Sequence, residues 1–420
     1  MGLTNEAASG GRHRRRRSAA RAAAIIMVLA VLSVAGVGYV RFAAHEQAAS
    51  PRPADAIVVP GSSPFTTEAA IALAQLQRNV ADAYTHTHLW QAASALSATI
   101  GFMRATGSRA YLSDLSATYL SHHHDGRTFR SNYYDDEGWW VLTWIRAYEL
   151  TGDRAYLRQA RSVFKALTKG WNPVCGGGLQ WTHRIPYKNA ITNETFMADA
   201  ALLHEATPGD TRYARWALRE WRWFSASGLL TGSHLVVDGL SARCRPKLGS
   251  PTWTYNQGML IGAMVSMAKM TGRRSFLVTA RKVARAVIRS PRLSPHGILR
   301  EPCSPSSCGR DAPMFKGIFM ANLKLLYDRA GGAAYQAYMR RNAVAVWAHD
   351  RRGTSFGLDW AGPFHASTIT AQASALDVLT TQIPALARPA RGPLTAREPA
   401  TAREPLTART DGPAAGRGPA

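Results

Sequence analysis

Apolar residues recur every three to four positions through most of the stretch from residue 65 to residue 382. That spacing places them along one face of a helix, whereas the two-residue alternation that marks strands is rare and short in this chain. The pattern therefore predicts a single all-α domain over residues 65–382.

A short turn motif separates many of the predicted helices. It occurs at Ala105–Leu112, Leu150–Leu157, Ala206–Tyr213 and Met270–Leu277, and more weakly at Arg329–Tyr335. In these segments a glycine ends one helix, and an Asp or Ser soon afterwards can cap the next. The motif returns after about 45 to 65 residues, which suits one helical hairpin plus a longer loop.

Repeated helical hairpins predict a solenoid or a closed ring. About eleven or twelve helices fit the domain, so we expect an (α/α)6 barrel, a toroid of helical hairpins. The long loops fall at alternate junctions and would gather at one end of the barrel, where a site is expected. They are residues 121–137, 170–190, 228–253 and 291–313.

The two ends of the chain differ from the helical domain. Residues 1–41 hold a basic block followed by an apolar run at 22–40, the layout of a cytoplasmic basic segment with a signal peptide or a membrane anchor. The apolar run predicts an N-terminal helix and possible membrane association, with the rest of the chain extracellular. Residues 42–64 are Pro-rich and predict a linker, and the Pro/Ala/Arg-rich residues 383–420 predict a disordered tail.

The formal net charge of +24 arises largely from arginines near the two termini. Such a charge can indicate nucleic-acid binding, but no nucleic-acid motif accompanies it and no one predicted helix concentrates it. Attraction to an anionic membrane or cell wall suits an exported protein better, and a solvated arginine-rich surface explains it as well. The sequence predicts a monomer without a cofactor, although calcium stays open.

Four cysteines fit an oxidising compartment. Cys303 and Cys308 are close enough in sequence to close a small loop, and Cys175 and Cys244 offer a second bridge. Three connectivities are possible, and free thiols are a further alternative. A metal site is disfavoured because no C-x-x-C pair is present. The consecutive residues His122–Asp125 also resemble metal ligands, but their side chains would diverge, so we interpret them as a solvated loop.

The segment Asn132–Trp140 combines polar and aromatic groups at the start of a predicted helix. Acidic residues there can simply complement the helix dipole and cap free N–H groups. The functional interpretation rests on Asp135 and Asp136, because glycoside cleavage requires one carboxylic acid and one carboxylate close together. Repulsion between two adjacent carboxylates would raise the proton affinity of one of them.

Other segments join hydrogen-bonding groups to aromatic residues just before predicted helices. They are Gly176–Trp181, Lys188–Glu194, Asp238–Gly239, Tyr255–Gly258 and Phe315–Phe319. The glycine run is not a phosphate-binding loop, because no G-K-[ST] follows it. Neither G-x-S-x-G nor H-E-x-x-H occurs, which argues against two common classes of hydrolase.

Taken together, these strings resemble glycoside hydrolase family 76, the α-1,6-mannanases. The resemblance covers most of residues 66–380 and lies in five motifs that keep the family's order: Tyr133–Trp140 with Ala147–Asp153, Gly176–Trp181, Lys188–Glu194, Tyr255–Gly258 and Phe315–Phe319. The family often has Asn or another residue where Glu137 stands, and Ile-Trp-Trp where this chain has Leu179–Trp181. Those departures concern subsite preference rather than the catalytic pair.

The resemblance implies an (α/α)6 barrel and endo-acting, retaining cleavage of α-1,6-linked mannan. By motif position, Asp135 would be the nucleophile and Asp136 the general acid/base. Sugar contacts would come from seven residues: Tyr134, Trp139, Trp181, Asn193, Asp238, Asn256 and Lys316. Two alternatives stay open, a cell-wall transglycosylase of the same fold and a non-catalytic protein that binds wall glycan.

Overall fold

The computed structural model describes residues 63–80, 84, 89–124 and 129–384. The apolar run at 22–40 and the tail from residue 385 onward lie outside these residues, so the anchor or signal and the tail stay predictions. Within the described ranges, no helix has both the length and the apolar character needed to cross a lipid bilayer.

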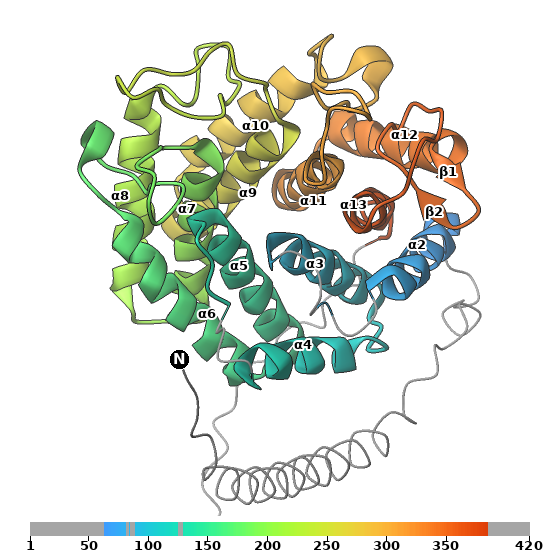
Figure 1. Cartoon of the computed structure of the whole chain (residues 1–420), viewed down its shortest axis with the longest axis horizontal. Coiled ribbons are helices and arrows are strands. Elements are labelled where there is room, and N and C mark those ends of the chain that lie inside the picture. Colours follow the sequence, from blue (N-terminus) through green and yellow to red (C-terminus); the bar gives the residue numbers. More distant parts are fainter. Residues whose placement is uncertain (1–62, 81–83, 85–88, 125–128, 385–420) are drawn as a thin grey trace, which may run out of the picture. The chain divides into compact units, whose positions relative to one another are not determined.

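Twelve α-helices within the described residues form an inner and an outer set (Figure 1). The inner helices are α3 (Leu89–Thr106), α5 (Tyr134–Thr151), α7 (Ala190–Ala206), α9 (Thr254–Thr271), α11 (Ala312–Ala330) and α13 (Ile369–Thr380). The outer helices are α2 (Pro64–Val80), α4 (Leu112–His124), α6 (Arg154–Leu167), α8 (Thr211–Ser227), α10 (Arg274–Ile288) and α12 (Ala333–His349).

The inner helices close into a ring. Each of them packs against the next inner helix along the chain, and α13 packs against α3 to complete the circle (Figure 1). The outer helices α6, α8 and α10 each pack against the inner helix that precedes them. The predicted all-α barrel of helical hairpins is therefore confirmed.

The composition of each helix explains which ring it joins. Helix α9 is buried almost all round from Thr254 to Ala268, as expected of a helix surrounded by protein. Helix α10 instead buries one stripe at helical spacing, which includes Phe276, Ala280 and Val283, and exposes its arginines. Burial on all sides favours the inner ring, and a single apolar stripe favours the outer ring.

The recurring turn motif lies between each inner helix and the following outer helix, as predicted. Gly152 and Gly272 end α5 and α9 in the left-handed conformation and donate their N–H groups to carbonyls of the last turn. Asp153 and Asp210 cap α6 and α8 by accepting backbone N–H groups two residues on. The tight turns therefore occupy the rim opposite the long loops.

The inner helices all begin at one rim, because an outer helix running the other way joins each to the next. The long loops before them contact one another there, through isolated bridges between Tyr133 and Thr182 and between Asn189 and Gly239. The gathering of loops at one end is thus confirmed. The short elements of this rim are η3 (Thr168–Gly170), η4 (Val174–Gly176), η5 (Pro295–Gly297), β1 (Arg351–Arg352) and β2 (Ser355–Phe356).

Two disulfides hold the long loops. Cys175 pairs with Cys244, which joins the loop before α7 to the loop before α9, and Cys303 pairs with Cys308 within the loop before α11. A bridge between residues far apart in sequence restricts the unfolded chain and so stabilises the fold. Both bridges lie in loops of the rim at which the inner helices begin.

One prediction about these loops is wrong. His122, His123 and His124 were expected in a solvated loop, but α4 continues through His124. Leu115 and Thr118 of α4 are buried, and no glycine or proline occurs in the sequence between Leu115 and Gly126 to end the helix earlier. The loop before α5 therefore begins only after His124.

Candidate active site

The start of α5 is held in place by the loop before α7. The backbone N–H of Tyr134 donates to the carbonyl of Trp181 at 2.9 Å, and the N–H of His183 donates to the carbonyl of Asn132 at 3.0 Å. The ring of Tyr134 is buried and stacks on the imidazole of His183, with the ring centres 4.2 Å apart. These contacts lay the loop across the first turn of α5, which carries the predicted acid pair.

Asp135 and Asp136 lie in that first turn and are both half-buried. The indole N–H of Trp181 donates to Oδ2 of Asp135 at 3.1 Å, and the backbone N–H of Asp136 donates to its Oδ1 at 3.2 Å. The hydroxyl of Ser131 donates to Oδ2 of Asp136 at 3.0 Å. The N-cap of α5 is Tyr133, which makes no side-chain capping bond.

Both acids hold protons more tightly than an ordinary aspartate. Burial raises the pKa of Asp136 to about 7, and the carboxylates of Asp311 and Glu137 also raise it, against the lowering effect of Ser131. Burial and the charge of Asp136 raise the pKa of Asp135 well above its ordinary value. Two adjacent carboxylates resist joint ionisation, so the pair holds a proton more tightly than isolated aspartates do. Asp135 carries the two N–H donors, which stabilise a negative charge on that residue.

A third carboxylate, Asp311, lies at the start of α11 and was not predicted as a site residue. Its Oδ1 accepts the indole N–H of Trp90 at 3.1 Å and the amide N–H of Gln91 at 2.7 Å, both from the first turn of α3. Its sequence context, before an Ala-Pro helix start, indicates no more than a helix boundary. Asp136 in α5 and Asp311 before α11 are far apart in sequence, and closure of the ring of inner helices brings them close together.

Aromatic side chains surround this carboxylate cluster. Tyr255 stacks on Phe315 with ring centres 3.8 Å apart, and the ring centres of Trp90 and Trp139 are 6.2 Å apart. Burial raises the pKa of the Tyr255 phenol, and nearby carboxylates raise it further. Those carboxylates belong to Asp238, Asp135, Glu194 and Asp311. Tyr255 therefore stands among acids from the starts of α5, α7 and α11 and from the loop before α9.

Among the predicted sugar contacts, Trp181 and Asp238 are half-buried. Trp181 contacts Asp135 directly, and Asp238 accepts a hydrogen bond from the hydroxyl of Tyr187 at 3.0 Å. Burial raises the pKa of Asp238, and Tyr187 and Lys247 lower it. Of the seven predicted sugar contacts, these two have a polar group and a partly exposed side chain beside the acid cluster.

The other predicted contacts are buried and hold the scaffold. The side-chain amide of Asn193 forms two hydrogen bonds with the backbone of Leu179. Its oxygen accepts the N–H of Leu179 at 2.7 Å, and its N–H donates to the carbonyl of Leu179 at 3.0 Å. The ammonium group of Lys316 donates to the carbonyl of Leu358 and lies 4.5 Å from the ring centre of Trp360. The remaining three, Tyr134, Trp139 and Asn256, are also buried. Their burial favours a positioning role over direct contact with a sugar.

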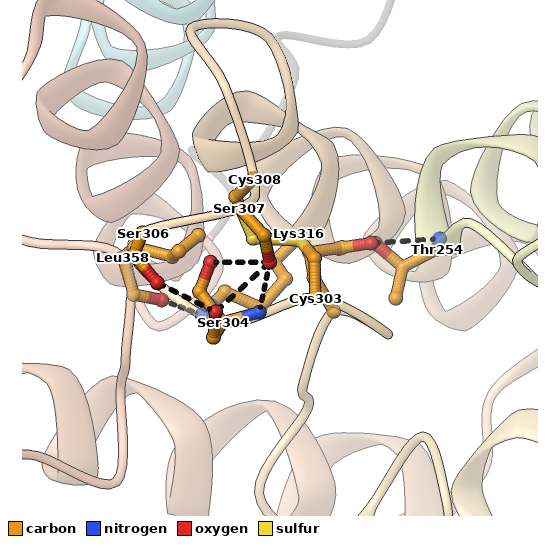
Figure 2. The surroundings of a disulfide bond; sticks show 9 residues. Thr254, Cys303, Ser304, Ser306, Ser307, Cys308, Lys316 and Leu358 are labelled. Atoms are coloured by element: carbon orange, nitrogen blue, oxygen red, sulfur yellow. Dashed lines mark hydrogen bonds between the residues drawn. A yellow bond between two sulfur atoms is a disulfide. The ribbon is translucent and has the colours of Figure 1, made fainter.

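The Cys303–Cys308 loop lies beside the N-terminal end of α11, where Asp311 is found. Figure 2 shows Thr254, Lys316 and Leu358 gathered around it. The hydroxyl of Thr254 donates to Glu301, which is buried and has its pKa raised to about 7 by burial. This loop thus ties the start of α9 to the start of α11, which carries Asp311.

The sequence predicts neither a metal nor a cofactor. Within the part of the chain that the structure describes, no group of three or more His, Cys, Asp or Glu side chains is placed to hold a metal ion.

The Trp181→Phe variant tests the hydrogen bond to Asp135. The change keeps an aromatic ring but removes a hydrogen-bond donor to a charged group. We therefore expect kcat for the glycoside cleavage predicted from the sequence to fall roughly 10-fold to 100-fold. Losing the donor also raises the pKa of Asp135, so the acid limb of the rate profile should move to higher pH. Steady-state rates from pH 4 to 9 would measure both, and an unchanged acid limb would remove Trp181 from this role.

The Asp311→Asn variant tests the third carboxylate. Asn can still accept from Trp90 and Gln91, but it removes a charge that raises the pKa of Asp136. The acid form of Asp136 would then be lost at lower pH, so the alkaline limb should move down while kcat at the optimum falls less than about 10-fold. Asp328→Asn, the same change on the exposed side of α11, should leave both limbs in place.

The chain is similar to a known protein family and to curated relatives. The sequence profile of glycosyl hydrolase family 76 matches residues 72–396. The mannan endo-1,6-alpha-mannosidase DCW1 of Candida albicans is 29% identical over an alignment of 233 residues, and the match covers 48% of this chain and 51% of that protein. The enzyme of the same name from Saccharomyces cerevisiae is 27% identical over an alignment of 249 residues, and the match covers 54% of each chain. The matched region thus spans about half the length of these curated relatives.

Solved structures share the fold. An inactive variant of the α-1,6-mannanase GH76A of Salegentibacter sp. HEL1_6, with two adjacent aspartates replaced by asparagine and α-1,6-mannotriose bound, superposes with a TM-score of 0.69 at 21% identity. The match covers 76% of this chain and 99% of that one. Dfg5 from Chaetomium thermophilum in complex with glucosamine matches with a TM-score of 0.67 at 18% identity, over 78% and 92% of the two chains.

Proposed function

The chain belongs to glycosyl hydrolase family 76, and from the placement of its acid pair we propose that it cleaves α-1,6-mannosidic bonds within mannan with retention of configuration. The observation that carries this proposal is the pair itself. Two adjacent, half-buried carboxylates share the first turn of α5, and the N–H donors are concentrated on Asp135. That asymmetry supports one ionised and one protonated acid, the division of roles that retaining hydrolysis requires.

In the first step a carboxylate oxygen of Asp135 attacks the anomeric carbon of a mannosyl unit. The bond from that carbon to the glycosidic oxygen breaks, and Asp136 gives its proton to the departing oxygen. In the second step Asp136, now ionised, takes a proton from water, whose oxygen attacks the same carbon and releases Asp135. Two inversions leave the product with the configuration of the substrate, and two carboxylates suffice for the chemistry.

Trp181 and Asp238 are the sugar contacts that we propose first, because both combine a polar group with some exposure beside the acid cluster. We add Trp90 and Tyr255, which are half-buried aromatics in the same cluster. Aromatic faces pack against the apolar faces of sugars, and carboxylates accept their hydroxyls. The relatives named as mannan endo-1,6-alpha-mannosidases support mannan as the substrate.

We propose that the enzyme works outside the cytoplasm, secreted or anchored to the outer face of the membrane. Two disulfides within the barrel support an oxidising compartment, since such bonds are rare in reducing cytosol. Association with the membrane would depend on residues 22–40, which lie outside the described residues. The expectation of a monomer stays a prediction.

Incubation of the full chain with linear α-1,6-mannan tests the activity. Endo hydrolysis predicts new reducing ends and a rapid fall in polymer length before small sugars accumulate. A transglycosylase would instead yield longer or branched products without a matching rise in reducing ends. Binding without any change in the polymer would favour a non-catalytic protein, and either of these last two results would overturn the proposal.

A further inference from the structure

An open groove of about 600 Å³ lies between the loop before α7 and the outer helix α8. Trp171 and the backbone of Cys175 to Gly177 form the loop side, and Arg219, Arg222 and Trp223 form the α8 side. None of its lining residues belongs to the acid cluster around Asp135 and Asp136. The proposed reaction therefore makes no use of this groove.

The arginines of the groove are exposed. Arg219 lies over the ring of Trp171, with its guanidinium carbon 4.2 Å from the centre of that ring and 5.0 Å from the centre of the Trp216 ring. Arg222 follows one helical turn later and lines the same groove. Among the described residues, neither arginine forms an ion pair. Contact with two indole rings restrains the guanidinium group of Arg219, and its exposure lets it donate to a ligand.

The neighbouring acid does not neutralise these charges. Glu220 is fully buried beneath them, and neither of its carboxylate oxygens has a hydrogen-bond partner. Burial raises the pKa of Glu220 well above its ordinary value, against the lowering effect of the charges of Lys188 and Arg219, so burial disfavours its charged form. Because this buried carboxyl forms no hydrogen bond with either exposed arginine among the described residues, both guanidinium groups stay available in the groove.

The walls of the groove are rigid. Trp223 is buried and its indole N–H donates to the carbonyl of Cys175 at 2.9 Å. The backbone of Gly177 and Gly178 packs directly against the Trp223 ring, and the disulfide to Cys244 fixes the loop. A rigid, cationic site with aromatic walls binds without a large ordering cost.

We propose that this groove binds an anionic substituent of the glycan, a phosphate or carboxylate group carried on a sugar. Two guanidinium groups one turn apart match the oxygens of such a group, and the aromatic wall offers contact for the sugar that bears it. The inference rests on the proposed function for its choice of a glycan as the carrier. The groove would hold a charged side group while the neutral backbone of the polymer reaches the acid pair.

Titration of the full chain with four probes tests the proposal. Mannose 6-phosphate and glucuronic acid are the anionic sugars, and mannose and inorganic phosphate are the controls, with binding followed by ligand-observed NMR. We expect one or both anionic sugars to bind more tightly than inorganic phosphate, and to weaken as salt rises. The stronger of the two identifies the charged group. Equal binding of inorganic phosphate, or no binding of either anionic sugar, would overturn the proposal.

Arginine variants of α8 test whether the anionic sugar binds in the groove. Arg219→Gln and Arg222→Gln should each weaken binding of the anionic sugar about 10-fold, because each loses a charge-assisted hydrogen bond. Arg215→Gln removes an exposed arginine of α8 that lies outside the groove, and it should bind as the parent does. Arg222 stacks on no aromatic ring in the part of the chain that the structure describes, so its variant is a control for any loss of folding in the Arg219 variant.

Hydrolysis of unsubstituted α-1,6-mannan separates this proposal from the proposed function. All three arginine variants should cleave the neutral polymer at the parent rate. If the parent binds anionic sugars in the groove but does not cleave mannan, only the proposed function fails. If it cleaves mannan and the Arg219 and Arg222 variants bind anionic sugars as tightly as the parent, only the groove proposal fails.

Discussion

Replacing Asp135 or Asp136 with asparagine is expected to lower the rate of mannan cleavage roughly 1,000-fold or more. Asparagine at position 135 cannot form the mannosyl-enzyme, and asparagine at position 136 cannot give a proton to the leaving oxygen. The rate of appearance of reducing ends from linear α-1,6-mannan measures both. Because the two acids act in one sequence of steps, the double variant should be little slower than the slower single variant.

Stability separates a catalytic role of the pair from a merely structural one. Asparagine is close in shape to aspartate, and it replaces a carboxyl group whose pKa is raised by burial. Because the charged form of that group is costly in the folded protein, the melting temperature of each variant should hold or rise at pH 7 to 8. Raised pKa values mean that the folded protein favours the protonated acids, and this contribution to stability is lost as pH increases through about 7. Asp153→Asn, at the cap of α6, is the matched control and should change neither activity nor stability. A large stability loss in both active-site variants would indicate a structural role instead.

Replacing Gly178 with alanine should destabilise the fold by about 2–4 kcal/mol, the sum of a backbone and a packing cost. Gly178 has a φ of +76°, and a Cβ atom there would lie 2.6 Å from the ring of Trp223. That ring is buried and held by its hydrogen bond to Cys175, so it has little room to move. Since the same loop carries Trp181, activity should fall together with stability.

Gly176→Ala provides the control for the packing cost. Gly176 has the same φ of +76°, but its Cβ atom would meet nothing within 4 Å. Its alanine variant should therefore show only the backbone cost of about 1 kcal/mol. Chemical denaturation of both variants measures the difference, and equal losses would show that the contact with Trp223 is not what requires a glycine at position 178.

The parts of this structure that follow from local pattern were predictable. The turn motifs place a left-handed glycine such as Gly152 next to a helix cap such as Asp153, so the hairpins and their order could be inferred from spacing alone. The start of α5 was also predictable, because acidic residues precede a run of buried aromatics. Closure of the ring follows from the number of hairpins.

Contacts between distant segments were not predictable from those patterns. Asp311 and Trp90 lie at opposite ends of the sequence, and only the packing of α3 against α13 and of α13 against α11 brings them together. The burial of Asn193 and Lys316 likewise depends on which loop covers them. Four cysteines allow three pairings, and the fold decides among them by bringing Cys175 close to Cys244.

The departure from the family pattern at Glu137 has a structural explanation. Glu137 is fully buried, and its Oε1 accepts from Arg130 at 2.9 Å and from the backbone N–H of Ser131 at 3.2 Å. His183 lies 3.4 Å from the same oxygen. Glu137 thus anchors the segment that presents Ser131 to Asp136. Contrary to the expectation from the sequence, this departure therefore bears on support of the acid pair rather than on subsite preference.

The division of labour between the two aspartates is tested most directly by trapping the reaction halfway. A fluorinated α-mannosyl donor that forms the glycosyl-enzyme faster than it is hydrolysed should add one sugar to the protein, and peptide mapping should locate it on Asp135. Proton NMR of the first products from mannan should show the α-anomer before mutarotation. A sugar attached to Asp136 or to no residue, or a β-anomer as the first product, would contradict the account.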